Sequence, residues 1–471
     1  VPGNEVESLE YHHGDILEVN GEYYIAAPSL NYQNSAIDFF NLRSLKAPSL
    51  SSYLSASETI KVGASAFHTT HMNPQTGDVL ISCLGNDDVN GTAPAGFVNI
   101  SPNVGSYKPD PADPNPLVIQ KYFTLQPDTG DAFLLSGTPP KDTYNYDFVI
   151  DPCNNILVCT SWGPPSSFDA GFNPTLPYGN TIRIFKMPQE AQPAPSQNLS
   201  LVTFFKTNFA EEGIVPLEVR RTHVPAQQVY FVGITLPGAI DLVYFDENTK
   251  VWNKKIIISK AKIVADCTST LLSNGPGQVA IGAAGLPPPL NGLPIPLITD
   301  ITLSEDDQFL YVSTWLSGVL LQYDVSNPMS PKLVGGVANL GGVAVAGDPT
   351  SFNTNSYSYA AGKQYAGGPQ MLRLDAAGYH LYVTNSLFSS WDDQFYGNAG
   401  PGVGPGSISK NGGMMIKLNT GVKQGKKVAP MSIDKTFATN GVVEFAELEH
   451  PSITGTFTSR AHESHIIGVR H

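Results

Sequence analysis

LSEDDQFLYV, residues 303–312, returns in altered form as LDAAGYHLYV, residues 374–383. Each copy begins with an apolar position, passes through an acidic or glycine-containing turn and ends in a strand-like core. A turn of this kind between two strand-like stretches predicts a β-hairpin. Such a hairpin cannot bury both of its faces alone. Copies of the unit must therefore pack against one another, and radial stacking of such units gives a β-propeller.

Strand-like cores of the same kind recur along the whole chain. They are residues 23–26, 79–82, 156–159, 229–232, 309–313 and 381–384, with a weaker seventh candidate at 466–469. The steps between the first six are roughly 55–80 residues, longer than common propeller repeats, so each unit carries long loops. Proline-rich and glycine-rich segments, such as 109–116 and 397–406, fit these loops better than domain boundaries. We expect one all-β domain over residues 1–471, a seven-bladed β-propeller.

The composition argues against several partners. Only 14% of residues are charged, and the net charge of −14 leaves no basic stripe for nucleic acid. No apolar run approaches the roughly 18–20 residues of a membrane helix, so we expect no membrane partner. Sequons at Asn90, Asn99 and Asn198 favour an exported glycoprotein, secreted or periplasmic. The four cysteines form no CxxC motif, and we expect buried free thiols.

A polar stretch stands at or just upstream of each core, and we call these stretches the leaders. They are residues 11–13, 68–71, 146–147, 218–223, 299–300, 367–370 and 461–465. Seven of the ten histidines fall in leaders. Because the first strand of each propeller blade lines the central channel, we expect the leaders to converge at one mouth of that channel.

Imidazole is a suitable ligand for copper, zinc, iron and nickel, and several neutral histidines around an open position make a redox or Lewis-acid site. A single channel histidine is more often a hydrogen-bonded polar residue, but the clustered set favours a metal. Four carboxylates are candidates for orienting histidine N–H groups or accepting protons: Asp147, Glu218, Asp300 and Glu463. Glu218, Arg220 and Asp300 have an alternative interpretation as a buried ion-pair network that ties blades together.

Several specific motifs resemble the selenium-binding protein family, which includes the copper-dependent methanethiol oxidases. They are FHTTH (67–71) with SCLG (82–85), YDF (146–148) with DAGFNP (169–174), PLEVR (216–220) with His223, ITDI (298–301) with DDQFLY (306–311), GGPQM (367–371), WDDQFY (391–396) and AHE (461–463). The resemblance covers nearly the whole chain, from about His12 to His462.

The resemblance implies a seven-bladed propeller with a histidine-ligated copper centre. The implied reaction takes a small thiol, methanethiol, with O2 and water to formaldehyde, hydrogen sulfide and hydrogen peroxide. The implied ligands are drawn from six histidines: His12, His13, His68, His71, His223 and His462. We expect Asp300 or Glu463 to accept the methyl proton, with Glu218 as a further catalytic carboxylate.

The chain also departs from the family pattern. Relatives carry a segment ahead of the position of Tyr11, so we expect an incomplete seventh blade that a partner chain or a cleaved segment completes. Ser161 and Ser317 stand where relatives tend to have Glu and His. These departures support an alternative function, a non-catalytic structural or metal- and selenium-binding propeller that has lost turnover. A calcium-dependent, lactonase-like propeller is disfavoured, because calcium prefers carboxylate and amide oxygens over imidazole.

Overall fold

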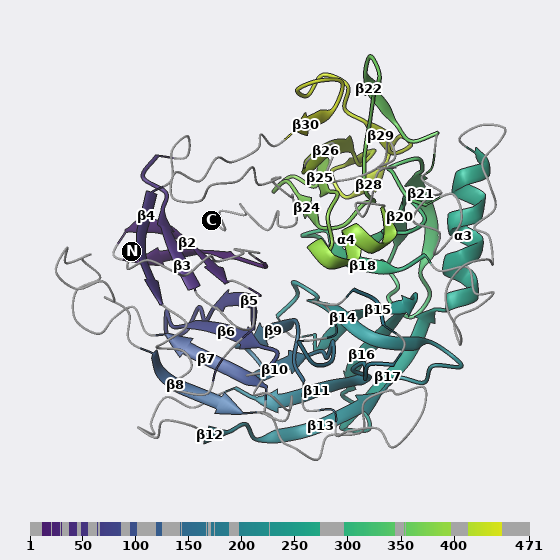
Figure 1. The fold of residues 1–471 in the computed structure, drawn as a ribbon. Coiled ribbons are helices and arrows are strands. Elements are labelled where there is room, and N and C mark those ends of the chain that lie inside the picture. Colours follow the sequence, from purple (N-terminus) through teal and green to yellow (C-terminus); the bar gives the residue numbers. More distant parts are fainter. Residues whose placement is uncertain are drawn as a thin grey trace. The chain divides into compact units, whose positions relative to one another are not determined.

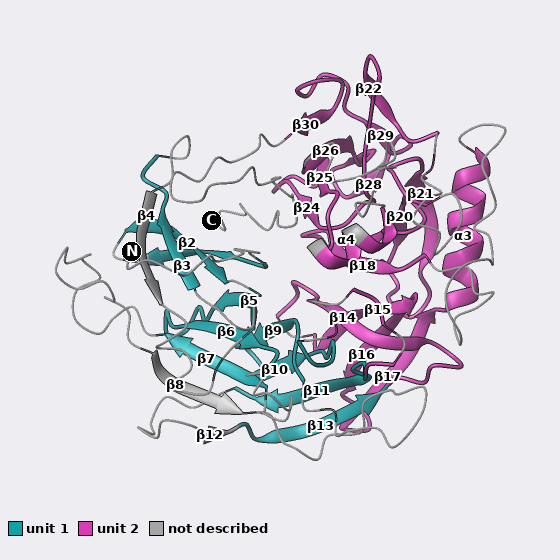
Figure 2. Cartoon of the chain, in the orientation of Figure 1, with its two compact units in different colours: residues 1–166, 177–206, 465–467 teal, residues 167–176, 207–464, 468–471 magenta. Residues whose placement is uncertain are grey.

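The computed structural model of the chain describes residues 12–19, 21–28, 30, 37–44, 49–54, 64, 66–85, 95–100, 119–124, 142, 144–165, 167, 171–173, 175–187, 197–225, 227–273, 296–343, 353, 355–396 and 413–444. The regular structure of these residues is almost entirely β-sheet (Figure 1). The chain divides into two compact units, coloured separately in Figure 2. Unit 1 holds residues 1–166 and 177–206, and unit 2 holds residues 167–176 and 207–464. The expected single domain over 1–471 stays a prediction.

The described residues of unit 1 form three sheets, which we number as blades 1 to 3. Blade 1 runs β1 (Asp15–Val19), β2 (Glu22–Pro28), β3 (Ile37–Asn41), β4 (Ser49–Leu54). Blade 2 runs β5 (Phe67–Met72), β6 (Val79–Cys83), β7 (Gly96–Ile100), β8 (Ile119–Thr124), with β12 (Gln197–Asn198) added in parallel to β8. Blade 3 runs β9 (Phe148–Asp151), β10 (Ile156–Cys159), β11 (Thr181–Lys186), β13 (Leu201–Lys206).

Unit 2 contains blades 4 to 6. Blade 4 runs β14 (Gly213–Arg221), β15 (Val229–Pro237), β16 (Ala239–Asp246), β17 (Val251–Ile258), and blade 5 runs β18 (Ile298–Leu303), β19 (Phe309–Thr314), β20 (Val319–Asp324), β21 (Lys332–Val337). Blade 6 runs β24 (Leu372–Leu374), β25 (His380–Thr384), β26 (Met414–Asn419), with β29 (Ser432–Ile433) and β30 (Val442–Glu444) on β26. Two small hairpins are β22 (Ser358–Ala360) with β23 (Lys363–Gln364) and β27 (Val422–Lys423) with β28 (Lys426–Lys427).

The six cores predicted from the sequence are confirmed, since each lies in the second strand of one blade. The two repeated decapeptides form the hairpins β18–β19 and β24–β25, with Leu303 opposite Leu310 and Leu374 opposite Leu381. The turns place Asp307 at φ 56° and Gly378 at φ 69°, which explains their acidic and glycine residues. The chain is an all-β propeller, and its described residues form six blades. The seventh core, 466–469, lies outside them.

Helix α3 (Lys260–Ser273) is not predicted by the sequence analysis. Ser259 caps its start: its carbonyl oxygen accepts from Ile263 N and its hydroxyl oxygen accepts from Lys262 N. The helix buries one stripe at helical spacing: Ile263, Asp266, Cys267, Thr270 and Leu271. Ile263, Cys267 and Leu271 join the apolar core of blades 4 and 5. The shorter helix α4 (Ser389–Phe395) lies in unit 2.

The cysteine prediction is confirmed at three positions and wrong at the fourth. Cys83, Cys159 and Cys267 are buried free thiols, whereas Cys153 is exposed. Cys153 follows Pro152 in the tight turn that joins β9 to β10, so its side chain leaves the sheet. Among the described residues, no helix has the length and apolar character needed to cross a membrane.

Candidate functional site

The described leaders lie on, at the end of, or shortly before the first strand of each blade, and that strand is always an edge strand of its sheet. In unit 1, β5 contacts both β1 and β9, and in unit 2, β18 contacts both β14 and β24. The first strands of consecutive blades in one unit are therefore neighbours. This placement brings together chemistry-bearing side chains that lie far apart in the sequence.

In four blades a hydroxyl on the second strand, or directly after it, anchors a backbone N–H of the leader or of the residue that follows the leader. The bonds run from Thr69 N to Ser82 Oγ (2.9 Å), from Asp147 N to Thr160 Oγ1 (3.2 Å), from Asp300 N to Ser313 Oγ (2.8 Å) and from Met371 N to Thr384 Oγ1 (3.2 Å). The strand register shifts beside the anchored residue in β5 and β18, as in a β-bulge that redirects a side chain.

The residue before each anchored N–H occupies an equivalent place in its blade, and we call these four the inner-edge residues. They are His68, Tyr146, Thr299 and Gln370, and all four are fully buried. The same backbone frame thus presents an imidazole, a phenol, a hydroxyl and an amide. The sequence places all four in leaders, but it predicts a role in the site, as a metal ligand, only for His68.

Three histidines of unit 1 form a buried cluster. The ring centroid of His68 lies 4.3 Å from that of His13 and 5.2 Å from that of His12. All three side chains are at most 3% exposed. Thr70 N donates to His13 O at 3.0 Å, which ties the histidine pair to β5. His13 has a φ of 30°, a left-handed conformation that is costly for a non-glycine residue and often marks a functional site.

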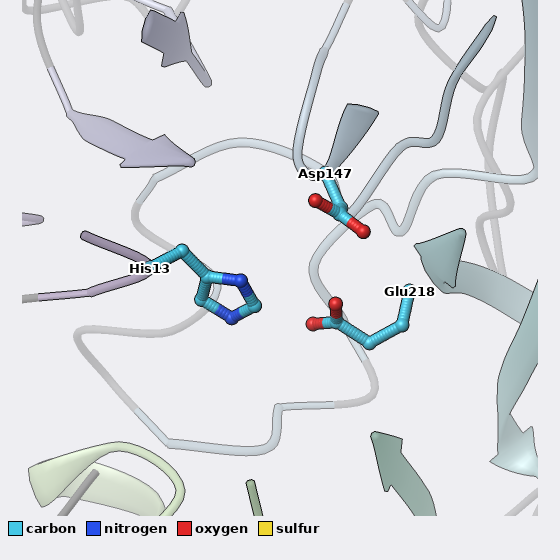
Figure 3. Close-up of side chains that lie close together, drawn as sticks. All are labelled: His13, Asp147 and Glu218. Carbon is cyan, nitrogen blue, oxygen red and sulfur yellow. The ribbon is translucent and has the colours of Figure 1, made fainter. Parts of the chain in front are cut away.

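Blade 3 adds an aromatic wall and an acid to this cluster. The Tyr146 ring lies 3.6 Å from the His68 ring and stacks on Trp162 at 5.5 Å. A carboxylate oxygen of Asp147 lies within 4.8 Å of a ring nitrogen of His13 (Figure 3). In this unit, His13 and Asp147 offer ligand atoms at a spacing that suits a metal ion, and imidazole is a common ligand of copper and zinc. Glu218, the third residue labelled in Figure 3, belongs to unit 2 and is described with that unit.

His68 has a fixed ring orientation. Its Nδ1 lies 2.8 Å from Thr69 Oγ1, and Thr69 N is itself anchored to Ser82. If Nδ1 carries the proton and donates to Thr69, then Nε2 keeps its lone pair and is the ring's ligand atom. Ser82 Oγ also donates to Tyr146 O at 2.6 Å, so one hydroxyl positions both His68 and Tyr146.

The remaining predicted histidines have other surroundings. His71 is half-exposed, its ring packs edge-on against Phe148 at 4.9 Å, and its Nδ1 lies 3.5 Å from Asp15. His223 lies in unit 2, where its Nδ1 is 2.7 Å from Asp307 Oδ1. His462 and Glu463 lie outside the described residues.

The predicted carboxylates Glu218 and Asp300 form a buried ion-pair network in unit 2. Arg220 Nη2 donates to Glu218 Oε2 at 2.9 Å and to Asp300 Oδ1 at 2.8 Å. Asp300 Oδ1 also accepts from Ile301 N at 2.7 Å, and Oδ2 accepts from Leu372 N at 2.6 Å. Both carboxylates are fully buried. Asp300 therefore links the first strands of blades 4, 5 and 6, which matches the alternative interpretation of a network that ties blades together.

Comparison with known proteins identifies the family. The family model described as 56kDa selenium binding protein (SBP56) matches residues 136–463. This chain belongs to the selenium-binding protein family. The motif resemblance is thereby confirmed.

Named relatives align over most of the chain. Selenium-binding protein 1 of Arabidopsis thaliana is 29% identical over 82% of this chain and 68% of its own. Methanethiol oxidase of Rattus norvegicus is 30% identical over 81% of this chain and 71% of its own. A solved structure of a hypothetical selenium-binding protein from Sulfolobus tokodaii shares the fold, with a TM-score of 0.62 at 24% identity over 92% of this chain and 82% of its own.

Proposed function

We propose that this family member is a copper-dependent oxidase of a small thiol such as methanethiol. The observation that carries the proposal is the buried cluster of His12, His13 and His68. Relatives at 30% identity that are named methanethiol oxidase give the substrate class. The balanced reaction oxidises the methyl carbon of the thiol and reduces O2, so that thiol, O2 and water become aldehyde, hydrogen sulfide and hydrogen peroxide.

Copper, when bound, would supply the one-electron chemistry that lets a thiol react with O2. His12, His13 and His68 would hold it, with Nε2 as the ligand atom of His68. Asp147, close to His13, would accept a proton from the thiol substrate. Tyr146 and Trp162 would exclude water from one side of the cluster, because both rings are fully buried.

Asp300 is a weaker candidate for the base than the sequence suggested. Both of its oxygens already accept bonds from Arg220 or from backbone N–H groups. We assign Asp300 a positioning role and place proton transfer with Asp147. Glu463 stays a prediction.

The test is metal content and peroxide release, with a matched histidine control. The His68→Ala variant should lose bound copper and methanethiol-dependent peroxide. His380→Ala should change neither, because His380 pairs with Asp375 at the β25 hairpin, away from the leaders of blade 6. Full copper binding by His68→Ala, or wild-type protein loaded with copper that releases no peroxide from methanethiol, would contradict the proposal.

A second candidate function is a metal-binding propeller without turnover. Ser161 and Ser317 occupy positions where the family pattern led us to expect Glu and His, and both have structural bonds here. Ser161 Oγ donates to Asp142 at 2.6 Å, and Ser317 Oγ lies 2.5 Å from Thr314 Oγ1. Copper binding that depends on His68 but gives no peroxide would favour this candidate.

We also propose a seventh blade that contains residues 466–469, and export from the cytoplasm. Among the three sequons, Asn99 is a poor glycan acceptor, because its side chain is buried and donates to Asp78 at 3.1 Å. The sequon argument for export therefore rests on Asn90 and Asn198. Mass spectrometry of peptides from the native protein would show whether either position carries a glycan.

A further inference from the structure

Gln370 has a buried side chain whose two polar ends find no hydrogen-bond partner among the described residues. Both its Nε2 and its Oε1 are inaccessible to solvent in that part of the chain. A buried amide in this state forfeits the hydrogen bonds it makes with water in the unfolded chain, which is why buried polar groups are almost always paired. An exception of this kind points to a ligand or to an ordered water molecule.

The backbone of Gln370 is held on both sides. Gln370 N donates to Thr384 O at 2.9 Å, and Met371 N donates to Thr384 Oγ1. Thr299 Oγ1 donates to Pro369 O at 3.4 Å, and Leu372 N donates to Asp300. These four hydrogen bonds fix the backbone around Gln370. A small backbone shift that brought the amide to a partner would break some of them.

The position of Gln370 is the second observation. It is the inner-edge residue of blade 6, equivalent by the hydroxyl anchor to His68 in blade 2. The amide carries no charge, and the nearby charges of Arg220 and Asp300 are paired with each other. A neutral ligand with one donor and one acceptor matches such an amide.

We infer that Gln370 is a binding residue for a small neutral molecule with a hydroxyl or thiol group. The ligand's O–H or S–H donates to Oε1, and its oxygen or sulfur accepts from Nε2. This inference rests on the geometry of unit 2 alone and goes beyond the proposed function, because it assigns unit 2 a ligand contact of its own.

The test uses the metal-free full chain, so that it is independent of copper and of turnover. Gln370→Met keeps the side-chain length and removes both polar atoms. Gln322→Met is the matched control, because Gln322 is equally buried in unit 2 but bonds Tyr311 and Lys427. The probes are methanethiol and methanol, with dimethyl sulfide as the analogue that lacks a donor.

We expect the wild-type protein to bind methanethiol and methanol more tightly than dimethyl sulfide in calorimetric titration. Gln370→Met should weaken binding of the first two by about thirtyfold, the combined value of the two hydrogen bonds at about fivefold each. Its thermal unfolding midpoint should not fall, whereas that of Gln322→Met should. Equal binding by wild type and Gln370→Met, no binding by wild type, or a midpoint that falls as in Gln322→Met would overturn the inference. The last result would assign the amide to a structural water.

Discussion

Replacing Asp300 with Asn tests the network of unit 2 most directly. The substitution keeps the shape of the side chain but replaces one acceptor oxygen with an NH2 group. Asp300 accepts from Arg220, Ile301 and Leu372 through its two oxygens. Whichever way the new amide turns, its NH2 group faces at least one N–H donor, which is left without an acceptor.

The expected cost follows from these contacts. Hydrogen bonds to a charged group contribute about 1.5–3 kcal/mol each, and breaking a buried ion pair costs about 3–5 kcal/mol. Arg220 keeps its bond to Glu218 and is partly solvent-accessible, which lowers the penalty. We expect Asp300→Asn to reduce the free energy of unfolding by about 2–4 kcal/mol.

The assay is urea unfolding combined with hydrogen exchange of peptides from β18 and β24. The amides of Ile301 and Leu372 should lose protection, because both donate to Asp300. Glu247→Gln is the control, since the Glu247–Lys250 pair is exposed in the same unit and should contribute under about 0.5 kcal/mol. If Asp300→Asn unfolds at the wild-type urea concentration with unchanged protection, the network does not hold the blades together. If Asp300→Asn lost activity but kept wild-type stability, Asp300 would again be the candidate for the catalytic base.

Two further predictions concern titration and thiol reactivity. Burial raises the pKa of Asp241 from its ordinary 3.8 to about 8, with Glu212 and Lys254 beside it. Between about pH 4 and 8 the folded state then keeps a proton that the unfolded state has lost. The free energy of unfolding should therefore fall as the pH rises through this range, by at most about 1.4 kcal/mol per pH unit. In thermal unfolding measured across this range, Asp241→Asn should flatten the decline. A thiol reagent should label only Cys153 in the native protein and all four cysteines in urea; fast native labelling of a second thiol would contradict the burial of Cys83, Cys159 and Cys267.

The blades could be predicted from sequence because their signal is local. The cores alternate with turns whose acidic and glycine residues adopt positive φ, as at Asp307 and Gly378. The sequence does not predict helix α3, because its buried stripe includes Asp266, Cys267 and Thr270, and these residues weaken the apolar periodicity.

The site was harder to predict because residues of one leader lie far apart in space. His223 and Glu218 were assigned to one leader, but five residues of extended chain separate them by about 16 Å. His223 therefore lies past the end of β14, while Glu218 is buried within the strand. His71 is likewise on the exposed part of β5, three residues from the buried His68. Gln370 lacked a signal of its own, because an amide ahead of a strand is common, whereas Asp147 is among the four carboxylates that the sequence offers as candidates.

The hydroxyl anchors separate the shape of the inner edge from its chemistry. Ser82, Thr160, Ser313 and Thr384 hold the main chain through the N–H that follows each inner-edge residue, and Ser313 Oγ also lies 3.1 Å from the presented hydroxyl of Thr299. Evolution can exchange the presented group at one blade without disturbing the scaffold of the others. A designer could do the same, grafting an imidazole at 370 to build a new ligand sphere on an unchanged support.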